Sequence, residues 1–367
     1  VPTGSASPDY FGGKRPGNDL YADSLVVLRA QTGKMVWHFQ TVHHDLWDYD
    51  VASQPLLFTM KRNGREIPAV AAGSKTGHLF MFQRETGKPL FPIEERPVPA
   101  SDVPGEHASP TQPVPAMPKP LVPQTLNAAN AWGANEADRT WCQDTIRGLR
   151  ADGLFTPPSV KGSLQFPGNV GGMAWGGATF DPPHGLIIVP TNRLASIARL
   201  IPRQEYEKEA KSPHGDWEFA EQNGTPYGMA RRFFRNPRGL PCNAPPWGAL
   251  TAIDAATGAV KWEVPFGSLP GAGGDAAAEK LGSVNLGGAI ATGGGLVFIG
   301  ATLDAHLRAF DVLTGDELWK GELPAAARAT PMTYRAANGK QYVVIAAGGF
   351  DLPGLPLSDT LVAFALP

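Results

Sequence analysis

The chain has 367 residues, 42% of them hydrophobic, which is long for one compact domain and enough to bury a large core. A formal net charge of −2 and a pI near 6.5 offer no attraction to nucleic acid or anionic lipid, so neither is expected as a partner. No apolar run approaches the roughly 18 residues of a membrane span. Because the chain begins at Val1 rather than Met, we expect a fragment or a processed product.

Glycine and proline are abundant, at 43 and 36 residues, and almost no long segment has the apolar period of a helix. The first predicted element, residues 25–37, is a strand, a Thr-Gly turn and a second strand that ends at Trp37. The pattern recurs over residues 250–262 and 307–319, each time ending in Trp, and a weaker copy spans residues 79–87. We expect the turn glycines to adopt positive φ and the tryptophans to pack between sheets.

The spacing of the turn glycines indicates a long repeat. Gly33 and Gly87 are 54 residues apart, Gly258 and Gly315 are 57 apart, and Gly87 and Gly258 are 171 apart, which is three times 57. A degenerate copy is expected at residues 178–190, and the motif begins again at Leu361. A period in the fifties with strand signals throughout predicts an all-β fold, a β-propeller of which residues 1–367 form a partial domain of about five blades.

Two stretches interrupt this rhythm. Residues 92–123 contain ten prolines, which predict an extended excursion over the surface without regular pairing. Residues 199–240 form a charge-rich insertion, for which we expect a solvated loop, with a lid over a site as the alternative.

Residues 41–50, Thr-Val-His-His-Asp-Leu-Trp-Asp-Tyr-Asp, concentrate two imidazoles and three carboxylates around two aromatic rings. Such crowding shifts proton affinities and is typical of sites of proton transfer or metal binding. The alternative is a structural Trp-Asp pair of a repeat protein, with His43 and His44 in a solvated loop.

Cys142 and Cys242 are the two cysteines of the chain, and no haem-attachment or zinc spacing surrounds them. They are either two buried free thiols or a single disulfide formed in an oxidising compartment, and the sequence leaves both open.

Several segments together resemble one enzyme family. They are Ser-Pro-Asp-Tyr-Phe-Gly-Gly at 7–13, the segment at 43–50, Gly-Ser-Lys-Thr-Gly at 73–77, Cys-Asn-Ala-Pro-Pro-Trp-Gly at 242–248 and the Trp-ended repeats. This combination resembles the pyrroloquinoline quinone (PQQ) dependent dehydrogenases, and within them the membrane-bound glucose, quinate and shikimate group. The resemblance implies an eight-bladed propeller, of which this chain is the C-terminal portion, without the first blades and the N-terminal membrane anchor.

The resemblance also implies roles for individual residues. Asp48 corresponds to the general base that removes the proton of the substrate alcohol, and Lys75 to the cation that bonds the quinone oxygens. Trp175 and Trp247 correspond to inner positions near the cofactor, where core packing is an equally good explanation for each indole.

The same resemblance implies a divalent cation, usually Ca²⁺, with Asp48 as a ligand. Ser5 stands where the family has an Asn ligand, and a hydroxyl is a weaker ligand than an amide oxygen, so the ligand set is incomplete. The remaining candidates for substrate contact or support have a structural alternative in every case; they are His43, His44, Asn192 and Arg193.

The implied function is PQQ-dependent oxidation of a polyol or cyclic alcohol, such as glucose, quinate or shikimate. Electrons would pass to ubiquinone at the periplasmic side of the bacterial inner membrane, and the chain alone would be inactive. The alternative is a non-catalytic propeller for protein binding or assembly, a class that lacks the pair formed by Asp48 and Lys75.

Overall fold

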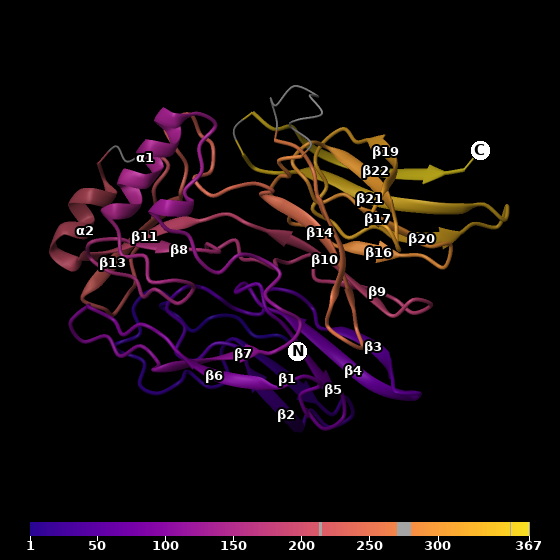
Figure 1. Ribbon diagram of the computed structural model, residues 1–367, viewed down its shortest axis with the longest axis horizontal. Coiled ribbons are helices and arrows are strands. Elements are labelled where there is room, and N and C mark those ends of the chain that lie inside the picture. The colour runs from indigo at the N-terminus through magenta and orange to yellow at the C-terminus, as the bar shows by residue number, and fades with distance from the viewer. Residues whose placement is uncertain (213–214, 270–279, 353, 367) are drawn as a thin grey trace.

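The computed structural model describes residues 1–212, 215–269, 280–352 and 354–366, and most of its elements are strands (Figure 1). Five antiparallel sheets follow one another in chain order. They comprise β1 (Ser24–Leu28) with β2 (Met35–Gln40); β3 (Leu56–Arg62), β4 (Arg65–Gly73) and β5 (Leu79–Gln83); β9 (Thr179–Asp181), β10 (Leu186–Asn192), β14 (Gly248–Asp254) and β15 (Val260–Pro265); β16 (Ala289–Ala291), β17 (Leu296–Ile299), β18 (His306–Asp311) and β19 (Glu317–Glu322); and β20 (Met332–Arg335), β21 (Gln341–Gly349) and β22 (Leu357–Ala365). The predicted all-β propeller of about five blades is confirmed.

The burial of each strand follows from its place in its sheet. β3 lies at an edge and alternates, with Phe58 and Met60 buried and Thr59 and Lys61 exposed, because only one of its faces meets the next sheet. β10 is buried along its whole length, since it lies between two strands of its own sheet and between two hydrophobic clusters. The core therefore consists of separate apolar layers between consecutive sheets.

The Trp-ended repeats join neighbouring sheets. Trp37 in β2 donates from Nε1 to the carbonyl of Arg84 at 3.0 Å, beside the next turn glycine, Gly87. Trp262 in β15 donates in the same way to the carbonyl of Val312 at 3.0 Å, beside Gly315. A Cβ atom built on Gly87 would lie 2.6 Å from Trp37, so the indole occupies the space that only glycine leaves. Both glycines have positive φ, as predicted.

The charge-rich insertion is an ordered sheet, so the prediction of a solvated loop over residues 199–240 is wrong. After β10 ends at Asn192, the chain leaves its sheet and returns only at Gly248 in β14. In between it builds most of a second four-stranded sheet beside the helices, seen at one end of the molecule in Figure 1. The stretch contributes β11 (Ser196–Pro202), α2 (Arg203–Ala210), β12 (Glu218–Ala220) and β13 (Tyr227–Phe233). The fourth strand of the sheet, β8 (Ser163–Gln165), precedes β10 in the chain.

Helix α1 (Glu136–Arg147) covers this end of the molecule and was not expected from the sequence. Asn135 caps it by accepting from the backbone N–H of Asp138, and every fourth residue is buried: Asp138, Cys142 and Ile146. Cys142 forms a disulfide with Cys242, with 5.6 Å between their Cα atoms. Of the two alternatives left open by the sequence, the structure therefore has the disulfide.

The proline-rich stretch contains regular pairing, so that expectation is also wrong. β6 (Ile93–Pro97) pairs antiparallel with β7 (Thr111–Pro115) in a two-stranded sheet. Both strands are edges, so the prolines can take positions where no ladder N–H is needed. A short 3₁₀ helix, η1 (Ala128–Asn130), follows. None of the helices in the described residues has the length and apolarity needed to cross a bilayer.

Candidate active site

Asp45 organises the loop that carries Asp48. Its carboxylate is fully buried and accepts from the backbone N–H groups of Trp47 and Tyr49, both at 2.9 Å. The hydroxyl of Ser5 donates to the same carboxylate at 2.5 Å. The loop so held places Asp48 at φ 62°, in the left-handed region that non-glycine residues rarely adopt. Such strain is found where the surrounding structure imposes a functional conformation.

Aromatic packing anchors the same loop from behind. The Trp47 indole donates to the carbonyl of Thr156 at 2.7 Å, and its ring stands edge-on to Phe155, with centroids 5.2 Å apart. Tyr49 donates from its hydroxyl to the carbonyl of Pro167. Trp47 and Tyr49 are fully buried, so they fix the loop and leave Asp48 as its partly accessible side chain.

Lys75 meets Asp48 from the turn between β4 and β5. It follows β4, and its Nζ atom lies 2.7 Å from Oδ1 of Asp48 and 3.0 Å from Oδ1 of Asp50. The backbone N–H of Lys75 donates to the carbonyl of Asp50 at 3.1 Å, which locks the two segments together. The side chains of Lys75 and Asp48 remain 11% and 22% exposed, so the pair is largely but not completely buried.

Burial and charge set the proton affinity of this pair in opposite directions. The net pKa of Asp48 is raised to about 6, because burial, the largest cause, and the negative charges of Asp45 and Asp50 raise it while Lys75 lowers it. Burial lowers the pKa of Lys75, but Asp48 and Asp50 outweigh it and the net pKa is raised. Lys75 is therefore a stable cation, and Asp48 is a carboxylate with more affinity for a proton than an ordinary aspartate.

Arg231 is a second cation at Asp48, and the sequence reading missed it. It extends from β13, and its Nη1 atom lies 3.6 Å from Oδ2 of Asp48. The same nitrogen donates to the hydroxyl of Tyr10 at 3.1 Å, and Nε donates to Glu218 at 2.9 Å. The charge run of residues 199–240 and the segment 7–13 were both noticed in the sequence, but nothing in either indicates that they meet at Asp48.

Trp175 lies on a segment that packs directly against Lys75. The backbone N–H of Gly172 donates to the carbonyl of Lys75 at 2.6 Å, and a Cβ on Gly171 would lie 2.4 Å from Cγ of Lys75. Trp175 itself is 57% exposed, which is unusual for so large an apolar ring. An exposed indole on a segment that packs against Lys75 is compatible with the predicted role of Trp175 at a flat aromatic cofactor, which stays a prediction.

His43 and His44 are held by protein groups. His43 lies between Gln40, 3.0 Å from Nδ1, and Glu95, 3.1 Å from Nε2. His44 lies 2.7 Å from the carbonyl of Gly17 and 3.1 Å from Glu106. These contacts correspond to the structural role stated as the alternative for each histidine. A contribution of His43 or His44 to substrate binding stays a prediction.

The other predicted residues lie in a network between sheets. The Asn192 amide donates to the carbonyl of Asn285 at 2.8 Å and accepts from its N–H at 2.8 Å. Arg193 pairs with Glu263 at 2.5 Å. Trp247 is 0% exposed and donates to the carbonyl of Asn243 at 2.9 Å. Core packing thus accounts for Trp247, and the proposed cofactor and substrate contacts of these three residues stay predictions.

The predicted metal ligands, Asp48 and Ser5, each contact other protein groups. Both Asp48 oxygens face cations, and the Ser5 hydroxyl contacts Asp45 and, at 3.1 Å, Asp23. In the described part of the chain no group of three or more His, Cys, Asp or Glu side chains is arranged to hold a metal ion. Ca²⁺ requires six to eight oxygen ligands. These residues by themselves do not fit a Ca²⁺ site, and the cation stays a prediction.

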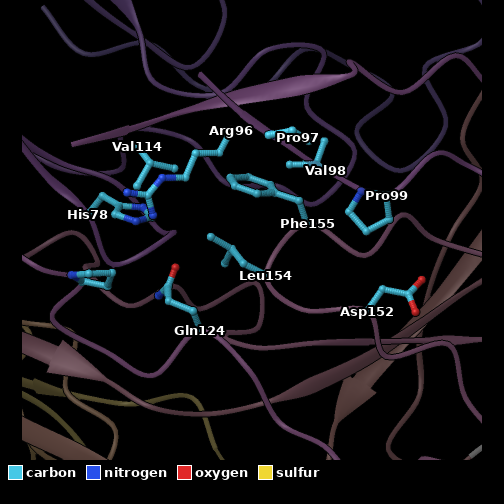
Figure 2. Close-up of a pocket in the computed structure, with 11 residues that line it drawn as sticks. His78, Arg96, Pro97, Val98, Pro99, Val114, Gln124, Asp152, Leu154 and Phe155 are labelled. Atoms are coloured by element: carbon cyan, nitrogen blue, oxygen red, sulfur yellow. The ribbon is translucent and has the colours of Figure 1, made fainter. Parts of the chain in front are cut away.

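A separate cavity of about 230 Å³ lies behind the aromatic anchor (Figure 2). Its walls include Val98, Leu154 and Phe155, and the ring of His78 lies beside the guanidinium of Arg96 at one side. Burial, together with the charge of Arg96, lowers the pKa of His78 to about 4. Neither Asp48 nor Lys75 lines this cavity, so it is distinct from the site described above.

The chain is similar to proteins of one family. Residues 1–343 match the PQQ family model described as glucose/ethanol/alcohol dehydrogenase, beta-propeller domain. The chain is 41% identical to quinoprotein glucose dehydrogenase of Escherichia coli and 41% identical to quinate/shikimate dehydrogenase (quinone) of Acinetobacter baylyi, in both cases over all of this chain and 47% of the relative. The solved quinohemoprotein alcohol dehydrogenase of Comamonas testosteroni is 25% identical with a TM-score of 0.60, over 95% of this chain and 42% of that one.

The chain thus spans about half the length of the curated relatives it matches. The match covers the Asp48 loop, the Lys75 turn and all three strong Trp-ended repeats, because it extends from residue 1 to residue 343. The resemblance noted in the sequence is confirmed, and the chain belongs to the family of PQQ-dependent glucose/ethanol/alcohol dehydrogenases with a β-propeller domain.

Proposed function

We propose that the protein containing this chain oxidises a polyol or cyclic alcohol, a sugar or a quinate-type cyclitol, with PQQ as the oxidant and Asp48 as the base. The observation that carries the proposal is the position of Asp48, which is strained, partly accessible and paired with Lys75 at 2.7 Å. The names of the relatives, glucose dehydrogenase and quinate/shikimate dehydrogenase, support the same substrate class.

The residues at the site fit a bound quinone. Lys75 supplies a buried positive charge for its oxygens, and Trp175 supplies an exposed flat ring. Held by these residues, PQQ would supply the hydride acceptor for the carbon that carries the substrate hydroxyl. Asp48 accepts the hydroxyl proton, so that the alcohol becomes a carbonyl compound and the proton is held on a carboxylate.

The ammonium of Lys75 favours the ionised form of the base. Lys75 lowers the pKa of Asp48 against the effect of burial, so a carboxylate persists near neutral pH in a site that is largely shielded from water. Asp45 contributes by holding the backbone of the loop and not by contact with substrate. The base is therefore positioned before substrate arrives.

We also propose that the site faces the periplasm and that electrons pass on to ubiquinone. The disulfide between Cys142 and Cys242 supports an oxidising compartment, because such bonds are rare in the reducing cytosol. The relative from Acinetobacter baylyi carries quinone in its name, which supports a quinone acceptor.

The test is PQQ-dependent dye reduction by the full protein with glucose, quinate, shikimate and inositol. Asp48→Asn should retain PQQ and lose about 10²- to 10⁴-fold in turnover on every substrate that wild type oxidises. Asp144→Asn, at an exposed position in α1, is the matched control and should retain wild-type turnover. Unchanged turnover in Asp48→Asn would exclude Asp48 as the base.

A further inference from the structure

Arg231 has donor capacity that the protein does not use. Its Nε atom donates to Glu218 and its Nη1 atom to the Tyr10 hydroxyl, whereas in the described residues no hydrogen bond is formed by Nη2. Asp48 lies 3.6 Å from Nη1, beyond normal hydrogen-bond length, so it does not close a two-pronged pair with the guanidinium. The side chain is 26% exposed, so it is partly accessible to a ligand.

The surroundings of Arg231 hold it in place. Tyr10 is buried, and its ring centroid lies 5.8 Å from the guanidinium carbon, so the side chain has contacts at two donors and at one face. Burial raises the pKa of Tyr10 well above its usual value, so the phenol stays neutral and does not neutralise the arginine. Glu218 is 65% exposed, and solvent screens its charge. A fixed guanidinium with a free edge is the arrangement that recognises a carboxylate.

The neighbouring Arg232 lies in the same strand as Arg231 but away from the site. Successive side chains of a strand point to opposite faces. Arg232 accordingly turns away from Asp48 and lies 4.7 Å from the Trp217 ring and 3.6 Å from Asp216. The two residues have the same chemistry and the same strand, so one serves as the control for the other.

We propose that Arg231 binds the carboxylate of a hydroxy-acid substrate whose hydroxyl faces Asp48. This rests on the proposed function and names its substrate class: a cyclic hydroxy acid, of which quinate is an example, in preference to a neutral sugar. The 3.6 Å between Arg231 and Asp48 requires the two groups of the substrate to be close together, as they are on a small ring. Sequence identity does not distinguish a sugar from a hydroxy acid as the substrate, because the chain is 41% identical to both the glucose dehydrogenase and the quinate/shikimate dehydrogenase.

The experiment compares wild type, Arg231→Gln, Arg231→Lys and the control Arg232→Gln in the full protein reconstituted with PQQ. Arg231→Gln should raise KM for quinate about 10- to 100-fold, the usual effect of losing a hydrogen bond to a charged group, and leave KM for glucose within twofold. Arg231→Lys should recover part of the loss, because it keeps the charge but not the two-pronged geometry. Arg232→Gln should leave both KM values unchanged.

Binding without turnover provides a second readout. Quinate should bind to Asp48→Asn in calorimetry, and adding Arg231→Gln to that variant should weaken the binding by the same factor as KM. PQQ is also a carboxylate, so its affinity is titrated in parallel by fluorescence quenching and should be unchanged. A loss of PQQ affinity instead would assign the arginine to the cofactor and overturn the substrate assignment.

Two further outcomes would overturn the inference. Equal losses of kcat on glucose and quinate in Arg231→Gln would show that the arginine only positions Asp48. Wild-type protein that oxidises glucose but neither oxidises nor binds quinate would exclude the hydroxy acid while leaving the proposed dehydrogenase function in place. Wild-type protein that oxidises no member of the panel would instead reject the proposed function.

Discussion

The Nζ atom of Lys75 lies 2.7 Å from Oδ1 of Asp48, although the two residues are 27 positions apart and lie in two different loops. Asp48 stands in the loop that follows β2, and Lys75 stands between β4 and β5. The contact forms because the backbone of Lys75 is tied to Asp50 on one side and to Gly172 on the other. The charge pair is therefore a property of the packing of three chain segments.

Lys75→Ala should weaken the binding of PQQ. Removing the ammonium leaves Asp48 and Asp50 without their shared cation. It also takes away the charge that we propose for the quinone oxygens. We expect the dissociation constant for PQQ, measured by quenching of tryptophan fluorescence, to rise about 10- to 100-fold. Lys61→Ala, at an exposed position in β3, is the control. A wild-type titration curve for Lys75→Ala would contradict the role assigned to Lys75.

Gly87→Ala should destabilise the protein more than Gly33→Ala. The two turn glycines have nearly equal φ values, 72° and 67°, so both substitutions carry the same backbone strain of about 1 to 2 kcal/mol. At Gly33 the new Cβ meets open space, whereas at Gly87 it would lie 2.6 Å from the Trp37 indole. We expect an additional loss of about 1 to 3 kcal/mol for Gly87→Ala in urea unfolding. Equal losses in the two variants would show that the indole contact contributes little.

Replacing Cys142 and Cys242 together by Ala should lower the free energy of unfolding. The bond joins residues 100 positions apart, and closing a loop of that length restricts the unfolded chain by about 4 to 5 kcal/mol in the chain-entropy model. Urea unfolding of wild type in dithiothreitol should converge on the curve of the double variant in the absence of reductant. Identical curves for oxidised wild type and the variant would show that the disulfide does not stabilise the fold.

His78 should make the fold sensitive to acid. Burial, aided by the charge of Arg96, lowers the pKa of His78 in the folded protein to about 4, whereas its pKa in the unfolded chain is near 6.5. The unfolded state therefore binds the proton first, and the free energy of unfolding falls as the pH drops from 6.5 toward 4, by about 2 to 3 kcal/mol. His78→Asn, whose amide can still donate to Thr76, should show a shallower decline over this window. A slope equal to that of wild type would exclude His78 as the cause.

Much of the fold follows from local patterns. The Thr-Gly turns and the Trp that ends each repeat recur at a period in the fifties, and a turn glycine with positive φ is a property of a few consecutive residues. The two regions that were predicted wrongly lack such a pattern. Prolines in β6 and β7 are tolerated because the sheet has only two strands, and the charged residues of β11 and β13 are held by sheet pairing that their composition does not reveal.

The sequence by itself determined that residues 41–50 are a special segment and, through its family resemblance, that Asp48 and Lys75 belong to one site. Only the tertiary structure decided the separate roles of these residues: Asp45 accepts hydrogen bonds that hold the loop, Trp47 and Tyr49 are buried and anchor it, and Asp48 stays partly accessible. Only the tertiary structure brought Arg231 to Asp48 from an inserted sheet. The physical reason is that hydrogen bonds and charge pairs act over a few ångströms in space, whereas sequence patterns report on residues that are close along the chain.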